Sequence, residues 1–160
     1  MRHFWEPKSA LCLLGASAPP GDLARRAMSN PPGMLDLAVF NGAAWRAAEI
    51  PAVNGHGTAL AVARFYGGLL AGGELDGARL LGAGSVAAMS GGEMSAHDAV
   101  LDAEVRWGLG VWVDHDGYGL GGSLGMADPA LGLAEAYVTR QMGDHVRAEA
   151  MDAAVRAALA

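Results

Sequence analysis

The first half of the chain carries apolar residues at the spacing of a helix face. The clearest case covers residues 58–71, where Thr58 is a suitable N-cap and Gly72 with Gly73 ends the apolar pattern. Shorter helices are predicted at Asp22–Met28, as one turn near residues 43–47, and at residues 86–89 behind a capping Ser85.

From Arg106 onward the apolar residues alternate with smaller or more polar ones, which is the period of a β-strand. Trp107 leads this alternation, and we expect its side chain to be substantially buried. Residues 91–102 are predicted to be a polar excursion before the sheet. The predicted strands form an antiparallel meander over residues 106–113, 122–127 and 132–139, with a hairpin turn at Asp114–Gly117.

The chain ends in a predicted helix at residues 144–159, with Asp144 as its cap and a face of small residues. Helices, then an antiparallel meander, then a further helix are typical of the α+β class, in which helices pack on an antiparallel sheet. With 160 residues, the chain is expected to be a single domain or part of one. Residues 1–20 are expected to form an irregular N-terminal segment.

The composition narrows the class of protein. Hydrophobic residues make up 52% of the chain and charged residues 18%, a balance that argues against disorder. The formal net charge of −6 supplies no basic surface for nucleic acid, so no nucleic-acid partner is expected. No apolar run reaches the roughly 18 residues of a transmembrane helix, so no membrane span is expected.

The compartment is predicted from the single cysteine and the N-terminus. Cys12 is the only cysteine, which excludes an intrachain disulfide and a cysteine-based zinc site and mildly favours a reducing compartment. We therefore expect a cytoplasmic protein. The alternative is secretion or a periplasmic location, because Arg2 and Lys8 precede a short apolar run and residues 16–18 resemble a signal cleavage site.

Two glycine-rich motifs lack the context that their chemistry requires. Residues 121–125 match the Gly-x-Ser-x-Gly nucleophile elbow around Ser123, but Asp128 and Pro129 follow where a helix is needed. Residues 117–122 match Gly-x-Gly-x-x-Gly without the βαβ unit of a dinucleotide site. No cofactor is therefore expected, and Ser123 is a weak candidate nucleophile.

A metal site is not expected either. Consecutive residues of an extended strand point to opposite faces, so the side chains of Asp114, His115 and Asp116 do not converge easily on one ion. The other four histidines show neither His-x-x-x-His nor His-Glu-x-x-His spacing.

Four blocks of the sequence resemble serine hydrolases of the β-lactamase family, in the esterase-like branch related to class C β-lactamases and penicillin-binding proteins. They occur in the family's order, and the resemblance covers roughly residues 20–160. The blocks are Trp45–Thr58, Gly73–Leu81, Arg106–Gly110 and Gly121–Pro129.

The resemblance implies a partial β-lactamase/transpeptidase-like fold, which corresponds to the C-terminal half of the family's chain. Family enzymes carry a nucleophilic serine in Ser-x-x-Lys and a Tyr-x-Asn-type motif, both upstream of these blocks, and this chain contains neither motif. The resemblance therefore implies a C-terminal portion that is inactive alone and contributes a cleft wall and part of the oxyanion hole. The intact family would hydrolyse carboxylic esters or β-lactams through an acyl-enzyme.

The third family motif, Lys-Thr-Gly or His-x-Gly, should fall within this chain. Counting back from Ser123 places it at Gly117, Tyr118 and Gly119, with the Leu120 N–H in the oxyanion hole and Gly117 in place of the histidine. The alternative register is His115-Asp116-Gly117. In either register, Ser123 is a structural residue that follows the motif.

Two rival functions stay open at this point. The chain could be a non-catalytic folded relic or interaction module, or a small hydrolase that uses Ser123. A half-domain would expose the apolar face that its missing N-terminal half should cover, so self-association or binding of that half is expected.

Overall fold

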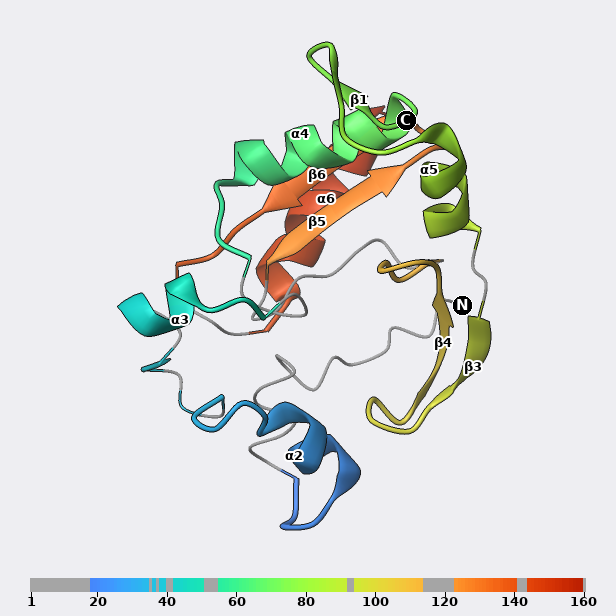
Figure 1. Cartoon of the computed structure of the whole chain (residues 1–160). Helices are drawn as coiled ribbons and strands as arrows, with labels where there is room; N and C mark the ends of the chain where they lie inside the picture. Colours follow the sequence, from blue (N-terminus) through green and yellow to red (C-terminus); the bar gives the residue numbers. More distant parts are fainter. Residues whose placement is uncertain are drawn as a thin grey trace. The chain divides into compact units, whose positions relative to one another are not determined.

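The computed structural model describes residues 18–34, 36, 38–39, 42–50, 55–91, 94–113, 123–140 and 144–159. These residues divide into two compact units. All the described strands lie between Gly57 and Val138, in what we call the sheet unit. The helical unit contains the described residues before Gly57 and after Val138. Helices accompany antiparallel strand pairs, which confirms the α+β class (Figure 1).

The central helix of the sheet unit is α4, Ala59–Leu70, as the apolar pattern predicted. The Thr58 hydroxyl oxygen accepts a hydrogen bond from the Ala61 N–H at 3.2 Å and so caps the first turn. Gly72 and Gly73 have φ of +75° and +89°, in the left-handed region that glycine adopts at little cost. The helix therefore begins and ends at the residues that the sequence indicated.

Strands β5 (Leu124–Asp128) and β6 (Leu133–Tyr137) form an antiparallel pair, and α4 packs on it (Figure 1). The face toward α4 consists of small residues, because Gly125 lies against α4 and pairs with Ala136, while Ala127 pairs with Ala134. The opposite face carries larger side chains, of which three are buried: Leu124 and Met126, each 3% exposed, and Glu135, 7% exposed.

A second antiparallel pair joins β3 (Met94–Asp98) to β4 (Ala103–Trp107). The prediction of a polar excursion over residues 91–102 was therefore wrong. All but the last residue of β3 are exposed, so the apolar alternation that marks a half-buried strand is absent there. Of the predicted meander, the antiparallel pairing of the second and third strands is confirmed by β5 and β6. The pairing of the first strand was wrong, because β4 pairs with β3 among the described strands.

The predicted strand over residues 106–113 is interrupted after Trp107. Gly110 has φ of +77°, the Gly108 N–H donates to the Val111 carbonyl at 2.9 Å, and the chain turns back. Trp107 forms an isolated bridge with Trp112, and their ring centroids lie 5.2 Å apart. Trp107 is half-buried, less than expected, and the buried residue of β4 is Val105.

Two further elements complete the described sheet unit. Strands β1 (Glu74–Leu75) and β2 (Ala78–Arg79) form a hairpin whose turn residues, Asp76 and Gly77, both have positive φ, as in a type I′ turn. Helix α5 spans Ala83–Ser90 and has Gly82, not the predicted Ser85, at its N-cap position.

The helical unit contains α2 (Leu23–Met28), α3 (Ala43–Ala47) and α6 (Val146–Leu159). Asp22 caps α2, since its carboxylate accepts from the Ala24 N–H at 2.8 Å. The Asp144 carboxylate accepts from the Val146 N–H at 3.3 Å, next to the predicted start of the last helix. Among the described residues, no helix combines the length and the apolar character needed to span a bilayer.

Candidate functional site

The predicted oxyanion-hole segment, Gly117, Tyr118, Gly119 and Leu120, lies outside the described residues, as does the alternative register at His115 and Gly117. The first described residue after that segment is Ser123, which directly precedes β5. The described part of the candidate site is therefore the start of β5 and the elements that pack on it.

Ser123 does not have the surroundings of a nucleophile elbow. That motif needs a sharp turn from a strand into a helix. Here the half-buried Ser123 leads straight into strand β5, and Asp128 then begins a turn. The Asp128 carboxylate accepts hydrogen bonds from the Ala130 and Leu131 N–H groups at 3.0 and 3.2 Å. Among the described residues, Ser123 is therefore followed by a strand and a turn, where a nucleophile elbow has a helix.

Helix α4 approaches β5 closely at Gly125. A Cβ atom at position 125 would lie 2.8 Å from Val62 Cγ1 and 2.9 Å from Tyr66 Cε2, closer than real Cβ atoms approach other atoms. Glycine is therefore required for this helix–strand distance. Burial against the strand raises the pKa of the Tyr66 phenol above its usual value of 10.0, because the charged phenolate would lose its hydration.

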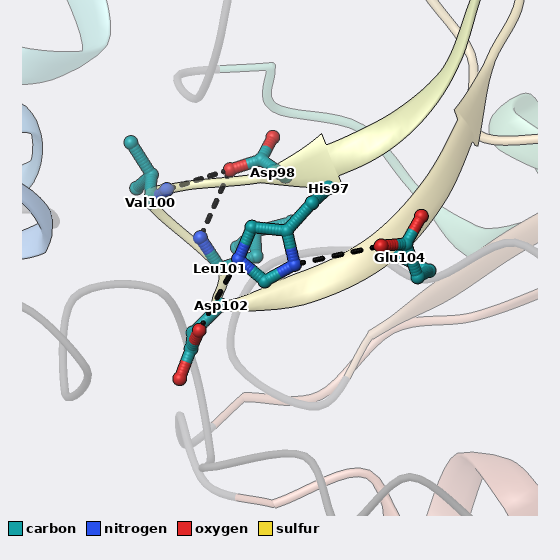
Figure 2. A network of polar contacts seen from close by, with 6 residues as sticks. All are labelled: His97, Asp98, Val100, Leu101, Asp102 and Glu104. Atoms are coloured by element: carbon teal, nitrogen blue, oxygen red, sulfur yellow. Dashed lines mark hydrogen bonds and ion pairs between the residues drawn. The ribbon is translucent and has the colours of Figure 1, made fainter.

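A polar cluster lies at the turn that joins β3 to β4 (Figure 2). His97 Nε2 is 3.3 Å from Asp102 Oδ1, and His97 Nδ1 is 3.7 Å from Glu104 Oε1. Because the two carboxylates approach opposite sides of the imidazole ring, the three groups do not converge on one point. Among the residues described, no group of three His, Cys, Asp or Glu side chains is arranged to hold a metal ion.

The same turn chemistry ends both β3 and β5. The Asp98 carboxylate accepts from the Val100 and Leu101 N–H groups at 2.8 and 2.9 Å, as Asp128 does in the second hairpin. Four residues after each aspartate the chain is left-handed, at Asp102 and at Gly132, with φ of +52° and +63°. The first hairpin was not predicted, although the spacing from Asp98 to Asp102 repeats that from Asp128 to Gly132.

The helices and antiparallel strand pairs of the described residues agree with the α+β fold of the serine hydrolases that the sequence blocks resemble. A family model described as Beta-lactamase matches residues 14–160. The chain therefore belongs to the β-lactamase family.

Relatives in this family include esterases and penicillin-binding proteins. The esterase/β-lactamase LipL of Mycobacterium tuberculosis is 38% identical over an alignment of 104 residues, and the match covers 59% of this chain and 24% of LipL. The crystal structure of a family VIII carboxylesterase matches 81% of this chain and 39% of its own, at 34% identity and a TM-score of 0.69.

A penicillin-binding protein homologue from Caulobacter crescentus matches 64% of this chain and 31% of its own length, at 37% identity and a TM-score of 0.57. The chain thus spans about a quarter of the curated relative and between 31% and 39% of the two solved ones. Its relationship to serine hydrolases of the esterase-like and penicillin-binding branches agrees with the resemblance of the four sequence blocks.

Proposed function

We propose that this chain is the C-terminal portion of a β-lactamase-family serine hydrolase that hydrolyses carboxylic esters or, less favoured, β-lactams. The observation that carries the proposal is the family match over residues 14–160 of a chain without Ser-x-x-Lys. Its single lysine, Lys8, has no serine three residues before it. The relatives named as an esterase and a carboxylesterase favour esters as the substrate class.

The nucleophile and its base would come from a segment that carries Ser-x-x-Lys and Tyr-x-Asn. In the proposed reaction the serine oxygen attacks the ester carbonyl and forms a tetrahedral intermediate. The alcohol then leaves with a proton, and water hydrolyses the acyl-enzyme to release the acid. This chain would supply the Leu120 N–H, which donates a hydrogen bond to the oxyanion of the tetrahedral intermediate.

The side chain at the third motif is the main departure from the family pattern. In the favoured register, Gly117 stands where the esterase-like branch carries histidine. A backbone N–H does not depend on that side chain, so the oxyanion hole would be retained while a polar group beside the substrate would be lost. Removing one oxyanion-hole donor costs roughly 10²–10³ in kcat, so the retained N–H matters.

The test is an activity assay with and without the complementary half. The chain alone is expected to turn over neither p-nitrophenyl acetate nor a chromogenic cephalosporin above buffer. A separately expressed N-terminal half of an esterase relative, carrying Ser-x-x-Lys, is expected to restore ester hydrolysis when mixed with it. The matched control is the same half with its motif serine changed to alanine. Turnover by the chain alone that disappears in Ser123→Ala would overturn the proposal.

We also propose that the isolated chain self-associates and is only marginally stable. Described apolar side chains on α4 are exposed, with Leu60 68% accessible, and β3 is exposed along most of its length. Such surfaces and strand edges promote association. Size-exclusion chromatography and thermal melts test this proposal. A compact monomer that unfolds cooperatively above about 65 °C, the upper end for mesophile domains, would contradict it.

A further inference from the structure

We infer that strand β3 is the edge through which two copies of this chain associate, by antiparallel pairing of β3 with β3 of the second copy, centred on Ala96. The inference rests on the self-association proposed above and names the strand and the register that produce it. It requires no catalytic group and no particular ester substrate.

Hydrogen bonds on the side of β4 that faces away from β3 show how its backbone groups point. The Gly108 N–H donates to the Val111 carbonyl at 2.9 Å, and the Val113 N–H donates to the Arg106 carbonyl at 2.8 Å. The N–H and C=O groups of successive strand residues point to alternate sides of the strand. Trp107 lies between Arg106 and Gly108, so its N–H and C=O point toward β3.

The same alternation identifies the free backbone groups of β3. Met94 is the partner of Trp107, so its N–H and C=O point toward β4. Those of Ser95 and His97 therefore point away from β4. Among the described residues, neither has a backbone hydrogen bond outside the β3–β4 pair, and no second strand lies beside β3 (Figure 1). Strand β3 thus presents free donors and acceptors along one edge.

The sequence of β3 does not protect this edge. Natural proteins commonly protect an edge strand with lysine, proline or a β-bulge. Residues 94–98 contain neither lysine nor proline, and their register with β4 is continuous. All but the last of these residues are exposed, and Met94 is 54% exposed. A strand edge of this kind is available to pair with a strand of another chain.

One register lets β3 pair with itself through both of its outward-pointing residues. When Ala96 lies opposite Ala96 of the second copy, Ser95 lies opposite His97 of the second copy. Each such pair exchanges both of its N–H···O=C hydrogen bonds. A register centred on Ser95 or His97 would place one outward-pointing residue opposite a residue beyond the strand. The register centred on Ala96 is therefore the one that uses the whole free edge of both copies.

The side chains of β3 are complementary in the same register. Ala96 forms the central pair, in which the Cα atoms lie about 4.5 Å apart and small side chains fit. The Ser95 hydroxyl lies opposite the imidazole of His97, a hydrogen-bonding partner. Asp98 lies opposite the uncharged Met94, so no like charges face each other across the pair. The Asp98 carboxylate already accepts two backbone hydrogen bonds in the turn. This self-complementarity identifies a second copy as the occupant of the edge.

Disulfide cross-linking of the full chain tests the register. Cys12→Ser removes the only native cysteine and provides the background. In it, Ala96→Cys is expected to form a linked dimer in oxidised glutathione, because Cα atoms about 4.5 Å apart are within reach of a disulfide. Ala61→Cys, an exposed alanine of α4, is the matched control and should remain unlinked. Linkage of Ala61→Cys without linkage of Ala96→Cys would overturn the assignment to β3.

Proline at position 95 tests the edge itself. Ser95→Pro removes an outward-pointing N–H and leaves the hydrogen bonds to β4 in place, whereas Ser95→Ala keeps that N–H and is the matched control. In analytical ultracentrifugation, Ser95→Pro is expected to raise the dimer dissociation constant by about tenfold or more, and Ser95→Ala by less than about threefold. Circular dichroism checks that the variants are folded. If Ser95→Pro does not fold, Ser95→Lys places a charge on the same edge and should weaken the dimer likewise.

The outcomes distinguish this pairing from the proposals above. A wild-type dimer that persists in Ser95→Pro, with no disulfide in Ala96→Cys, would overturn the pairing of β3 and leave self-association standing. A wild-type chain that is monomeric at high micromolar concentration would overturn both. Ester hydrolysis by the mixture with the N-terminal half is a separate measurement, and its failure would overturn the hydrolase proposal alone.

Discussion

His97 Nε2 lies 3.3 Å from Asp102 Oδ1, across the loop that joins β3 to β4 (Figure 2). Both side chains are largely exposed, so their pairing contributes little to stability. The backbone of Asp102 matters more, because its φ of +52° is unfavourable for a residue with a Cβ atom.

We therefore predict that Asp102→Gly unfolds at a higher urea concentration than Asp102→Ala. Both variants lose the carboxylate, and only alanine keeps the strain, so the difference in unfolding free energy is expected to be about 1 kcal/mol. At Gly67, within helix α4, the order should reverse, and alanine should be more stable than glycine. Equal stabilities of the two position-102 variants would contradict the prediction.

The close approach of Gly108 to α5 gives a second prediction. A Cβ at position 108 would overlap the Met89 carbonyl. A Cβ at position 110 would meet no atom within 4 Å, so an alanine there would be destabilising only because φ is positive. Gly108→Ala is expected to lower the unfolding free energy by about 3 kcal/mol, as overpacking against backbone does, and Gly110→Ala by about 1 kcal/mol. Chemical denaturation of the two variants measures both values. A loss of unfolding free energy in Gly108→Ala that is smaller than in Gly110→Ala would contradict the close approach of Gly108 to Met89.

Stability at alkaline pH depends on Tyr66. Burial raises the pKa of its phenol above 10.0, so the unfolded chain releases this proton at a lower pH than the folded chain. The free energy of unfolding should therefore be constant below about pH 9 and decrease as the pH rises through 10 toward the folded-state pKa. Tyr66→Phe should show a smaller decrease between pH 9 and 11. Identical pH profiles of wild type and variant would show that this phenol is not buried in solution.

The contribution of the Trp107–Trp112 contact to the unfolding free energy can be measured directly. Full burial of Trp107 would make Trp107→Ala cost about 3–5 kcal/mol, and its half-buried position reduces the expected cost to about 2 kcal/mol. A double-mutant cycle with Trp112→Ala should give a coupling of about 0.5–1.5 kcal/mol, since the ring centroids are 5.2 Å apart. Additive losses would show that the two rings do not interact.

Local signals in the sequence predicted the helices well. The apolar face from Thr58, the two glycines after α4 and the capping aspartate of α2 each act within a few residues of the element they define. The fold class and the family could also be inferred, because turn and glycine blocks keep their order along the chain. Helices could therefore be predicted wherever the sequence has an N-cap residue or a glycine that ends the helix.

The pairing of β5 with β6 was predicted, but the pairing of β4 with β3 was not. The alternation after Arg106 has the period of one long strand, but Gly108 and Gly110 allow the chain to turn back at its centre. Strand β3 is exposed on most of its length and so lacks the apolar pattern that marks a strand. The helix contact at Gly125 was also missed, since a glycine in a strand does not indicate what approaches it.

The packing of α4 on β5 and β6 also has a kinetic consequence. The three described hairpins can each form from neighbouring residues, but α4 meets its strands only when the chain over residues 71–123 closes as one loop. Closing long loops slows folding far more than it costs in stability. We expect hairpin formation to precede this closure, so that the helix–strand contact at Gly125 forms late and governs how fast the sheet unit assembles.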